Sequence, residues 1–165
     1  MEQNRRPRVI LVSGAVQARP EEIERAEQVG RLLAQAGAVV LTGGGSGVME
    51  AACRGARLAG GITLGVLPGA DASESPPNEH VRLAVYTGMR DARNAILVRT
   101  ADAVIAIGGG WGTLSEIALA RKAGRPTILL GSWELAAPDP ALRGIPSQAR
   151  DAAEAVAQAL AAVGP

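Results

Sequence analysis

An apolar run of strand length that ends in three consecutive glycines constrains this chain more than any other feature. The run, Ala103 to Ile107, is followed by Gly108-Gly109-Gly110-Trp111-Gly112 and then by residues with good helix propensity from Thr113 onward. A glycine run at this junction is costly, because each glycine loses more backbone entropy on folding than another residue would. The pattern predicts a buried strand, a turn with bare backbone and a helix.

The same order of elements occurs earlier in the chain. A strand over residues 38–42 runs into Gly43-Gly44-Gly45-Ser46-Gly47, and a helix is expected over residues 48–58. Bare backbone lets N–H groups approach a ligand closely, and the following helix adds its unpaired N–H groups and the positive end of its dipole. Residues 108–112 are called the first glycine turn below, and residues 43–47 the second glycine turn. Both turns are therefore predicted to bind an anion, most often a phosphate.

A purely structural explanation of the later turn also exists. Thr113-Leu114-Ser115-Glu116 fits a capping box, in which Thr113 accepts a hydrogen bond from the N–H of Glu116 and Glu116 accepts one from the N–H of Thr113. That arrangement leaves the glycines at 108–110 and 112 unexplained, because one or two glycines are enough for a tight turn. We therefore favour a ligand-binding turn.

Strand and helix patterns alternate along the rest of the chain. Strands are expected over residues 8–12, 38–42, 62–67, 81–86, 103–107 and 127–130, and helices from Pro20, over 48–58, 89–99 and 113–123, and from an N-cap at Ser147 to about 162. This alternation predicts an α/β fold, a Rossmann-like doubly wound parallel sheet of about six to seven strands with helices on both faces. Its strand-to-helix turns share the carboxyl edge, so Gly14, both glycine turns and the start of the 89–99 helix should lie on one rim.

Size and charge limit the kinds of partner. A chain of 165 residues fits one domain, and we expect a single nucleotide-binding or phosphate-binding domain over 1–165. The formal net charge is +1, and two tryptophans and one tyrosine are too few for base stacking, so nucleic acid is not an expected partner. We expect a small phosphorylated ligand instead.

Cysteine content and hydropathy bear on location and metals. Cys53 is the single cysteine, which excludes an intramolecular disulfide and a multi-cysteine metal site and fits a reducing cytoplasm. We expect Cys53 to be a small core residue, and His80, the single histidine, to be a solvated loop residue rather than a ligand. No apolar run reaches 18 residues, so we expect no membrane segment. We also expect a cytoplasmic protein and no bound metal.

The glycine turns lack the marks of two other nucleotide sites. Val48 stands where the last glycine of a G-x-G-x-x-G fingerprint would be, so a full NAD site is not expected. Neither turn has the lysine of a Walker A motif, so ATP hydrolysis is not expected either.

The polar, proline-rich stretch over 68–79 is long enough to be a lid or an interface arm.

Two charged residues are candidates for catalysis. Arg93 falls on a stripe with helical spacing, so its guanidinium must be paired, line a cavity or reach solvent at the helix edge; the stripe is Met89, Ala92, Arg93 and Ile96. Glu116, early in its helix, can point back to the glycine turn. Together they could hydrolyse a glycosidic bond, the arginine orienting the substrate and the carboxylate stabilising an oxocarbenium-like state or moving a proton. A structural salt bridge is the alternative.

Three motifs in order resemble the LONELY GUY family, long misnamed lysine decarboxylases: Gly43 to Met49, Gly88 to Asn94 and Gly108 to Glu116. The resemblance runs from about Val9 to Leu130 and extends to the superfamily of the DprA Rossmann-like domain and the molybdenum cofactor carriers. LONELY GUY enzymes are phosphoribohydrolases that split a nucleoside 5′-monophosphate into base and ribose 5-phosphate.

The resemblance assigns roles to the two charged residues. The family's P-G-G-x-G-T-x-x-E motif matches Gly108 to Glu116, which implies that Glu116 is the catalytic glutamate. Its G-M-x-x-R-K motif matches Gly88 to Asn94 with one extra residue or a shifted gap, which implies that Arg93 is the catalytic arginine.

Two residues depart from these motifs. Gly108 replaces the motif's proline, and Asn94 replaces its lysine, which removes a positive charge next to the expected phosphate. Both look more like the molybdenum cofactor carriers, which bind a phosphorylated pterin without converting it. We therefore expect either a phosphoribohydrolase or a non-enzymatic carrier or sensor, with no required cofactor and with the molybdenum cofactor as possible cargo.

The resemblance also implies a homodimer or higher homo-oligomer. For Trp111 two roles are open, stacking on a flat ring or covering the start of the helix. The residues expected to bind the ligand are Gly14, Gly43, Gly44, Gly45, Ser46, Asn94, Gly109, Gly110, Trp111, Gly112 and Thr113.

Overall fold

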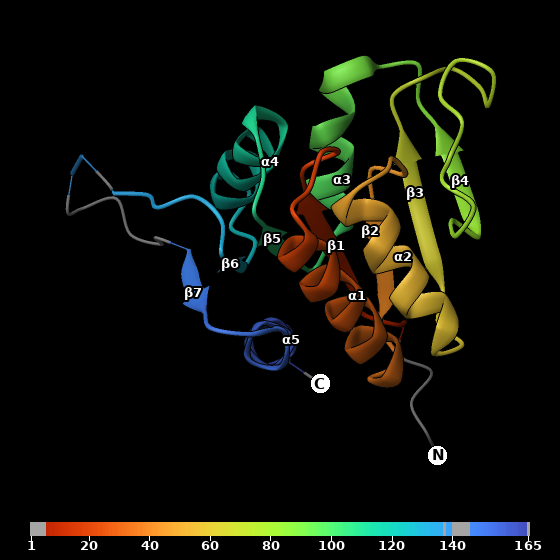
Figure 1. The fold of residues 1–165 in the computed structure, drawn as a ribbon. Coiled ribbons are helices and arrows are strands. Elements are labelled where there is room, and N and C mark those ends of the chain that lie inside the picture. Colours follow the sequence, from red (N-terminus) through yellow and green to blue (C-terminus); the bar gives the residue numbers. More distant parts are fainter. Residues whose placement is uncertain (1–5, 137, 140–145, 165) are drawn as a thin grey trace.

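A single parallel sheet organises the computed structural model, which describes residues 6–136, 138–139 and 146–164. Its strands are β1 (Val9–Gly14), β2 (Val39–Thr42), β3 (Thr63–Leu67), β4 (Leu83–Tyr86), β5 (Ala103–Ile107), β6 (Thr127–Leu130) and β7 (Ser147–Ala149). They lie in the order β4-β3-β2-β1-β5-β6-β7, and each neighbouring pair is parallel (Figure 1).

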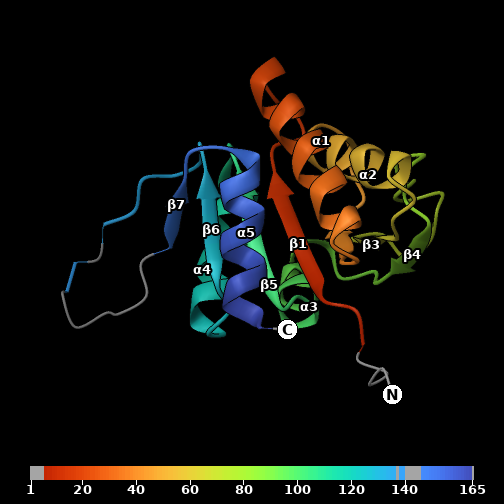
Figure 2. The same cartoon turned by 90° about the horizontal axis from the view of Figure 1, so that it is seen from below.

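Helices cover both faces of the sheet, as the alternating sequence pattern predicts (Figures 1 and 2). One face carries α1 (Pro20–Gln35), α2 (Val48–Leu58) and α5 (Ala152–Val163), which share a core cluster with Ile10 and Val12 of β1. The other carries α3 (Asn94–Thr100) and α4 (Trp111–Lys122), which share a second cluster with Leu11. Alternate residues of one strand thus fill opposite cores.

The direction of strand addition reverses between β1 and β5. The chain builds β1, β2, β3 and β4 outward on one side and then places β5, β6 and β7 on the other. In parallel α/β sheets, the crevice outside the carboxyl ends of the strands at such a reversal is where ligands bind. The end of β1 and the turn after β5 flank this point, and the turn after β2 lies beside it.

The prediction of one helix over residues 89–99 is wrong for its first half. A short 3₁₀ turn, η1 (Arg90–Arg93), precedes α3, and Arg90 has a φ of 50°. Because a 3₁₀ turn has three residues per turn, the i, i+3, i+4, i+7 spacing no longer keeps one face. Met89 and Ala92 are exposed, whereas Leu97 and Val98 are buried, so the expected inward stripe does not form.

The expected N-cap at Ser147 is also wrong. Ser147 begins strand β7, which pairs with β6, and Asp151 caps α5 by accepting a hydrogen bond from the Glu154 N–H at 2.8 Å. Both residues are good caps, and the open edge of β6 decides between them because pairing satisfies its backbone groups. Between β6 and β7, where neither a helix nor a strand is predicted, residues 137 and 140–145 lie outside the described residues.

The outer strand β4 is covered by no helix along its length (Figure 1). Leu83 and Val85 are 54% and 46% exposed.

Within the described ranges, no helix has the length and apolar character that crossing a membrane requires.

Candidate functional site

A cavity of about 260 Å³ lies at the carboxyl edge of the sheet, at the reversal between β1 and β5. It is lined by the end of β1, both glycine turns and the start of the α3 segment, so the prediction that these segments share one rim is confirmed. The lining residues are Val12, Ser13, Gly14, Ala15, Val16, Gly43, Met49, Asp91, Arg93, Asn94, Gly110, Gly112, Thr113 and Glu116.

Arg93 brings an unpaired cation into this cavity. Its Nε and Nη1 atoms are buried and have no hydrogen-bond partner. The guanidinium lies against the second glycine turn so closely that a side chain at Gly43 would overlap Nη1. Burial lowers the pKa of Arg93, while the charges of Glu116 and Asp91 oppose that shift. An unpaired buried cation is costly, so an anion that accepted hydrogen bonds from this group would stabilise it.

Glu116 faces Arg93 across the same cavity, and Ser13 holds it. The Ser13 Oγ donates a hydrogen bond to the Glu116 Oε2, which ties α4 to the end of β1. Burial raises the pKa of Glu116, and the Ser13 hydrogen bond and the Arg93 charge partly offset that rise. The carboxyl group therefore keeps its proton to a higher pH than an exposed glutamate does.

Asn94, at the start of α3, is buried, and its amide is already engaged. Its Nδ2 donates to the Ser115 Oγ at 2.9 Å. Asn94 lines the cavity beside Arg93 but contributes no charge to it. The position where the LONELY GUY motif has a lysine therefore holds a neutral side chain that links α3 to α4.

The second glycine turn contributes less lining than expected. Gly43 lines the cavity, whereas Gly44, Gly45 and Ser46 are not among the lining residues. The Gly44 N–H donates to the Thr42 Oγ1 at 3.1 Å, and Asn78 donates from its amide to the Gly45 carbonyl at 2.8 Å. The end of the polar stretch over 68–79 thus braces this turn.

The first glycine turn divides between two hollows. Gly110, Gly112 and Thr113 line the cavity, while Gly109 lines a separate hollow of about 380 Å³ with Trp133. Trp111 is 79% exposed and lines neither hollow. Its ring centroid lies 5.4 Å from that of Trp133, and the two rings are tilted by 38°.

The capping box between Thr113 and Glu116, the structural alternative to a ligand-binding turn, does not form. Helix α4 begins at Trp111 with Gly110 as its N-cap, and no side chain caps it. Glu116 instead reaches across to Ser13, because the earlier helix start moves it out of the position from which it could cap.

Sequence reasoning missed several lining residues. Ser13 directly precedes Gly14 at the end of a predicted strand, and that adjacency is a signal that could have identified it. Asp91 and Met49 carried no comparable signal, because the shape of η1 and the direction of the Met49 side chain depend on packing. The missed residues are Val12, Ser13, Ala15, Val16, Met49 and Asp91.

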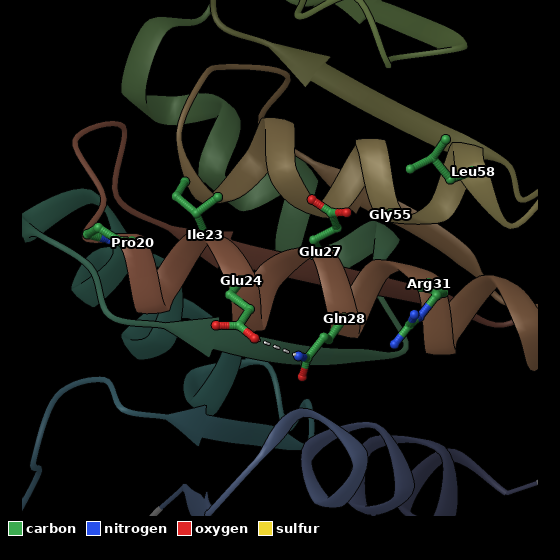
Figure 3. Close-up of a pocket in the computed structure, with 8 residues that line it drawn as sticks. All are labelled: Pro20, Ile23, Glu24, Glu27, Gln28, Arg31, Gly55 and Leu58. Carbon is green, nitrogen blue, oxygen red and sulfur yellow. Dashed lines mark hydrogen bonds between the residues drawn. The ribbon is translucent and has the colours of Figure 1, made fainter.

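A larger hollow, about 580 Å³, lies between α1 and α2 (Figure 3). Its lining comes from helix surfaces and includes none of the glycine turns. Glu24 in this hollow already accepts a hydrogen bond from Gln28 at 3.3 Å. Since no buried polar atom there lacks a partner, we place the candidate site at the rim cavity instead.

Comparison with known proteins agrees with the motifs. The chain is similar to a molybdenum cofactor binding protein from Rippkaea orientalis, with 37% identity, a TM-score of 0.83, and coverage of 94% of this chain and 96% of that one. It is also similar to the molybdenum cofactor carrier protein from Chlamydomonas reinhardtii, with 35% identity, a TM-score of 0.81, and coverage of 92% and 95%.

A plant relative links the chain to the LONELY GUY enzymes. It is the probable cytokinin riboside 5′-monophosphate phosphoribohydrolase LOGL5 of Oryza sativa, 34% identical over 93 residues, which are 56% of this chain and 38% of that protein. The sequence model of the SLOG cluster4 family matches residues 7–162. The chain therefore belongs to the SLOG cluster4 family, within the superfamily of the LONELY GUY enzymes and the molybdenum cofactor carriers.

Proposed function

We propose that the chain binds a phosphorylated pterin of the molybdenum cofactor type at the rim cavity and carries it without converting it. The observation that carries the proposal is the Arg93 guanidinium, whose buried Nε and Nη1 have no partner, in a side chain that lines the cavity together with residues of both glycine turns. A phosphate would supply acceptor oxygens to both nitrogen atoms and to the backbone N–H groups of the turns.

The neutral Asn94 and the size of the cavity favour a carrier. Asn94 is bonded to Ser115, so the phosphate would meet one cation rather than two. A volume of about 260 Å³ is small beside the roughly 300–1,000 Å³ of most ligand pockets, so the cavity would seat the phosphorylated end and leave the rings at the rim. The two structural relatives with this role in their names are covered over nearly their whole length.

Equilibrium binding of purified molybdenum cofactor tests this proposal. We expect saturable binding of one molecule per chain, lost in Arg93→Met and kept in the control Arg99→Met, whose exposed side chain lies on α3 away from the cavity lining. Absence of binding by the wild-type chain, or equal binding by Arg93→Met, would refute the proposal.

Hydrolysis of a nucleoside 5′-monophosphate is the second candidate, and Glu116 is the observation that favours it. Its carboxyl group lies in the same cavity as Arg93, and burial raises its pKa, as a group that transfers protons near neutral pH requires. Release of free base from AMP, abolished in Glu116→Gln, would establish hydrolysis in place of carriage. No release from a panel of nucleotides would exclude it.

We further propose that the ligand is a small molecule rather than nucleic acid. The formal net charge of +1 gives little attraction to a phosphate backbone. Two tryptophans and one tyrosine offer few stacking surfaces. A salt-dependent gel shift with single-stranded DNA at sub-micromolar protein would overturn this part of the proposal.

A further inference from the structure

A cluster of two carboxylates and one imidazole lies outside the rim cavity. Glu50, Glu79 and His80 each place one ligand atom so that all three lie within 4.8 Å of one another. Glu50 lies early in α2, and the other two residues directly follow Asn78 in the stretch that braces the second glycine turn. We infer that these three side chains bind one divalent transition-metal ion of the Zn²⁺ class.

The charges of the cluster favour a cation. Among the described residues Glu50 makes no ion pair, and Glu79 makes one, with the His80 Nε2 at 3.8 Å. Two carboxylates this close repel each other, and a divalent cation between them would turn that repulsion into attraction.

The donor set selects the type of ion. One imidazole nitrogen with two carboxylates suits Zn²⁺ or a similar ion better than Mg²⁺ or Ca²⁺, which prefer oxygen alone. Three protein ligands leave one position for water, and the 81% exposed Glu79 side chain keeps that position open to solvent.

The backbone around His80 is already fixed. The His80 N–H donates to the Asn78 Oδ1 at 3.1 Å, and the His80 carbonyl accepts from the Thr63 Oγ1 at 2.6 Å. The imidazole is therefore presented from a held segment, so ordering the ligands costs less than it would in a free loop.

A bound ion would join this segment to α2. Asn78 holds the Gly44 and Gly45 carbonyls, so fixing the two residues after it would also fix the second glycine turn. The ion would act as a clip beside the rim cavity. Metal binding itself does not depend on the proposed function, so its test reads metal and not ligand affinity.

Calorimetric titration of the untagged, chelator-treated chain with Zn²⁺ tests the inference. We expect one ion per chain with a Kd on the order of micromolar or tighter. Changes to residues that only orient metal ligands weaken binding about 10–100-fold, so His80→Ala and Glu50→Gln, which remove direct ligands, should weaken it at least 10-fold. The control Glu24→Gln, an exposed glutamate on α1, should bind as the wild type does.

Two further readouts keep the test decisive. His80 is the sequence's single histidine, so the NMR spectrum of the wild-type chain holds one imidazole signal, which should shift when Zn²⁺ is added. This readout needs no variant, so it stands even if His80→Ala fails to fold. Co²⁺ should give d–d bands without a thiolate charge-transfer band, because Cys53 is buried and outside the cluster. No saturable uptake, equal uptake in His80→Ala, an unmoved imidazole signal or a thiolate band would each overturn the inference.

Discussion

Ser13 and Glu116, 103 positions apart, are joined by a hydrogen bond from the Ser13 Oγ to the Glu116 Oε2. This bond links the end of β1 to α4 across the reversal in strand order, where the cavity lies. It holds a carboxyl group that burial would otherwise leave without a donor. Arg93 lines the same cavity, and its buried Nε and Nη1 have no such partner.

Ser13→Ala should destabilise the chain, and more strongly at high pH. The hydrogen bond from Ser13 lowers the pKa of Glu116, so its removal raises that pKa further. The penalty therefore grows as pH rises through the folded pKa of Glu116 in the wild type. A hydrogen bond to a charged group contributes about 1.5–3 kcal/mol.

Urea unfolding at pH 5 and pH 8 measures this effect. The matched control is Ser132→Ala, which removes a hydrogen bond to the neutral Gly108 carbonyl and should cost the same at both pH values. A Ser13→Ala penalty that does not change with pH would contradict the assigned role of the bond.

Glu116→Gln should stabilise the chain at pH 7–8. A carboxyl group whose folded pKa is raised contributes stability that is fully present below its unfolded pKa and is lost as pH rises through the folded pKa. Glutamine fits the same space and removes this loss. Each 1 kcal/mol gained should raise Tm by about 2–4 °C in a domain of this size. Thermal melts at pH 5 and pH 8 check it, and a variant less stable than wild type at pH 8 would be the contrary result.

Arg93→Met should separate stability from binding. Methionine fills a similar volume without an unpaired buried charge, so the free chain should be as stable as wild type or more so. Affinity for a phosphorylated ligand should fall about 100-fold, because charge-assisted hydrogen bonds contribute about 1.5–3 kcal/mol each. Thermal melts with and without ligand give both values, and a variant that is destabilised yet still binds would contradict the expectation.

Gly47→Ala should disrupt the second glycine turn. Gly47 has a φ of 69°, and a side chain there would overlap the carbonyl oxygens of Ala15 and Val16. Gly60→Ala is the matched control, because Gly60 has a φ of 76° with open space around its Cα. We expect Gly47→Ala to lower the free energy of unfolding by about 1–3 kcal/mol more than the control does, because overpacking costs about that much. Equal free energies of unfolding for the two variants would show that the overlap is absent.

The outer strand β4 is the face on which we expect a second copy of the chain. Leu83 and Val85 leave apolar surface on an uncovered strand, which favours pairing. We therefore expect light scattering to find an oligomer for the wild-type chain and a monomer for the double variant Leu83→Lys/Val85→Lys. A wild-type monomer, or an oligomer unchanged by both lysines, would refute this assignment.

The sequence predicts the elements best where one local pattern dominates. The bounds of β5, β6 and α2 match the expected ranges, because apolar runs and glycines limit them on both sides. The start of α3 could not be predicted, since Arg90 adopts a positive φ that its residue type does not indicate. The N-cap of α5 failed for a similar reason, because Ser147 and Asp151 are equivalent locally and only pairing with β6 distinguishes them.

The candidate site shows the same division. Placing the turns on one rim follows from strand order alone, so Gly14, Gly43, Arg93 and Glu116 could be brought together from sequence. Which atoms meet could not, because the bond to Ser13 depends on where α4 begins. The absence of the capping box and the missed serine thus have the same cause.

A crystal structure of the chain with bound molybdenum cofactor tests the central claim most directly. We predict the phosphate within hydrogen-bond distance of the Arg93 Nε and Nη1 and of backbone N–H groups from both glycine turns. A cofactor seated elsewhere, such as between α1 and α2, with the Arg93 guanidinium still unpaired, would contradict the claim.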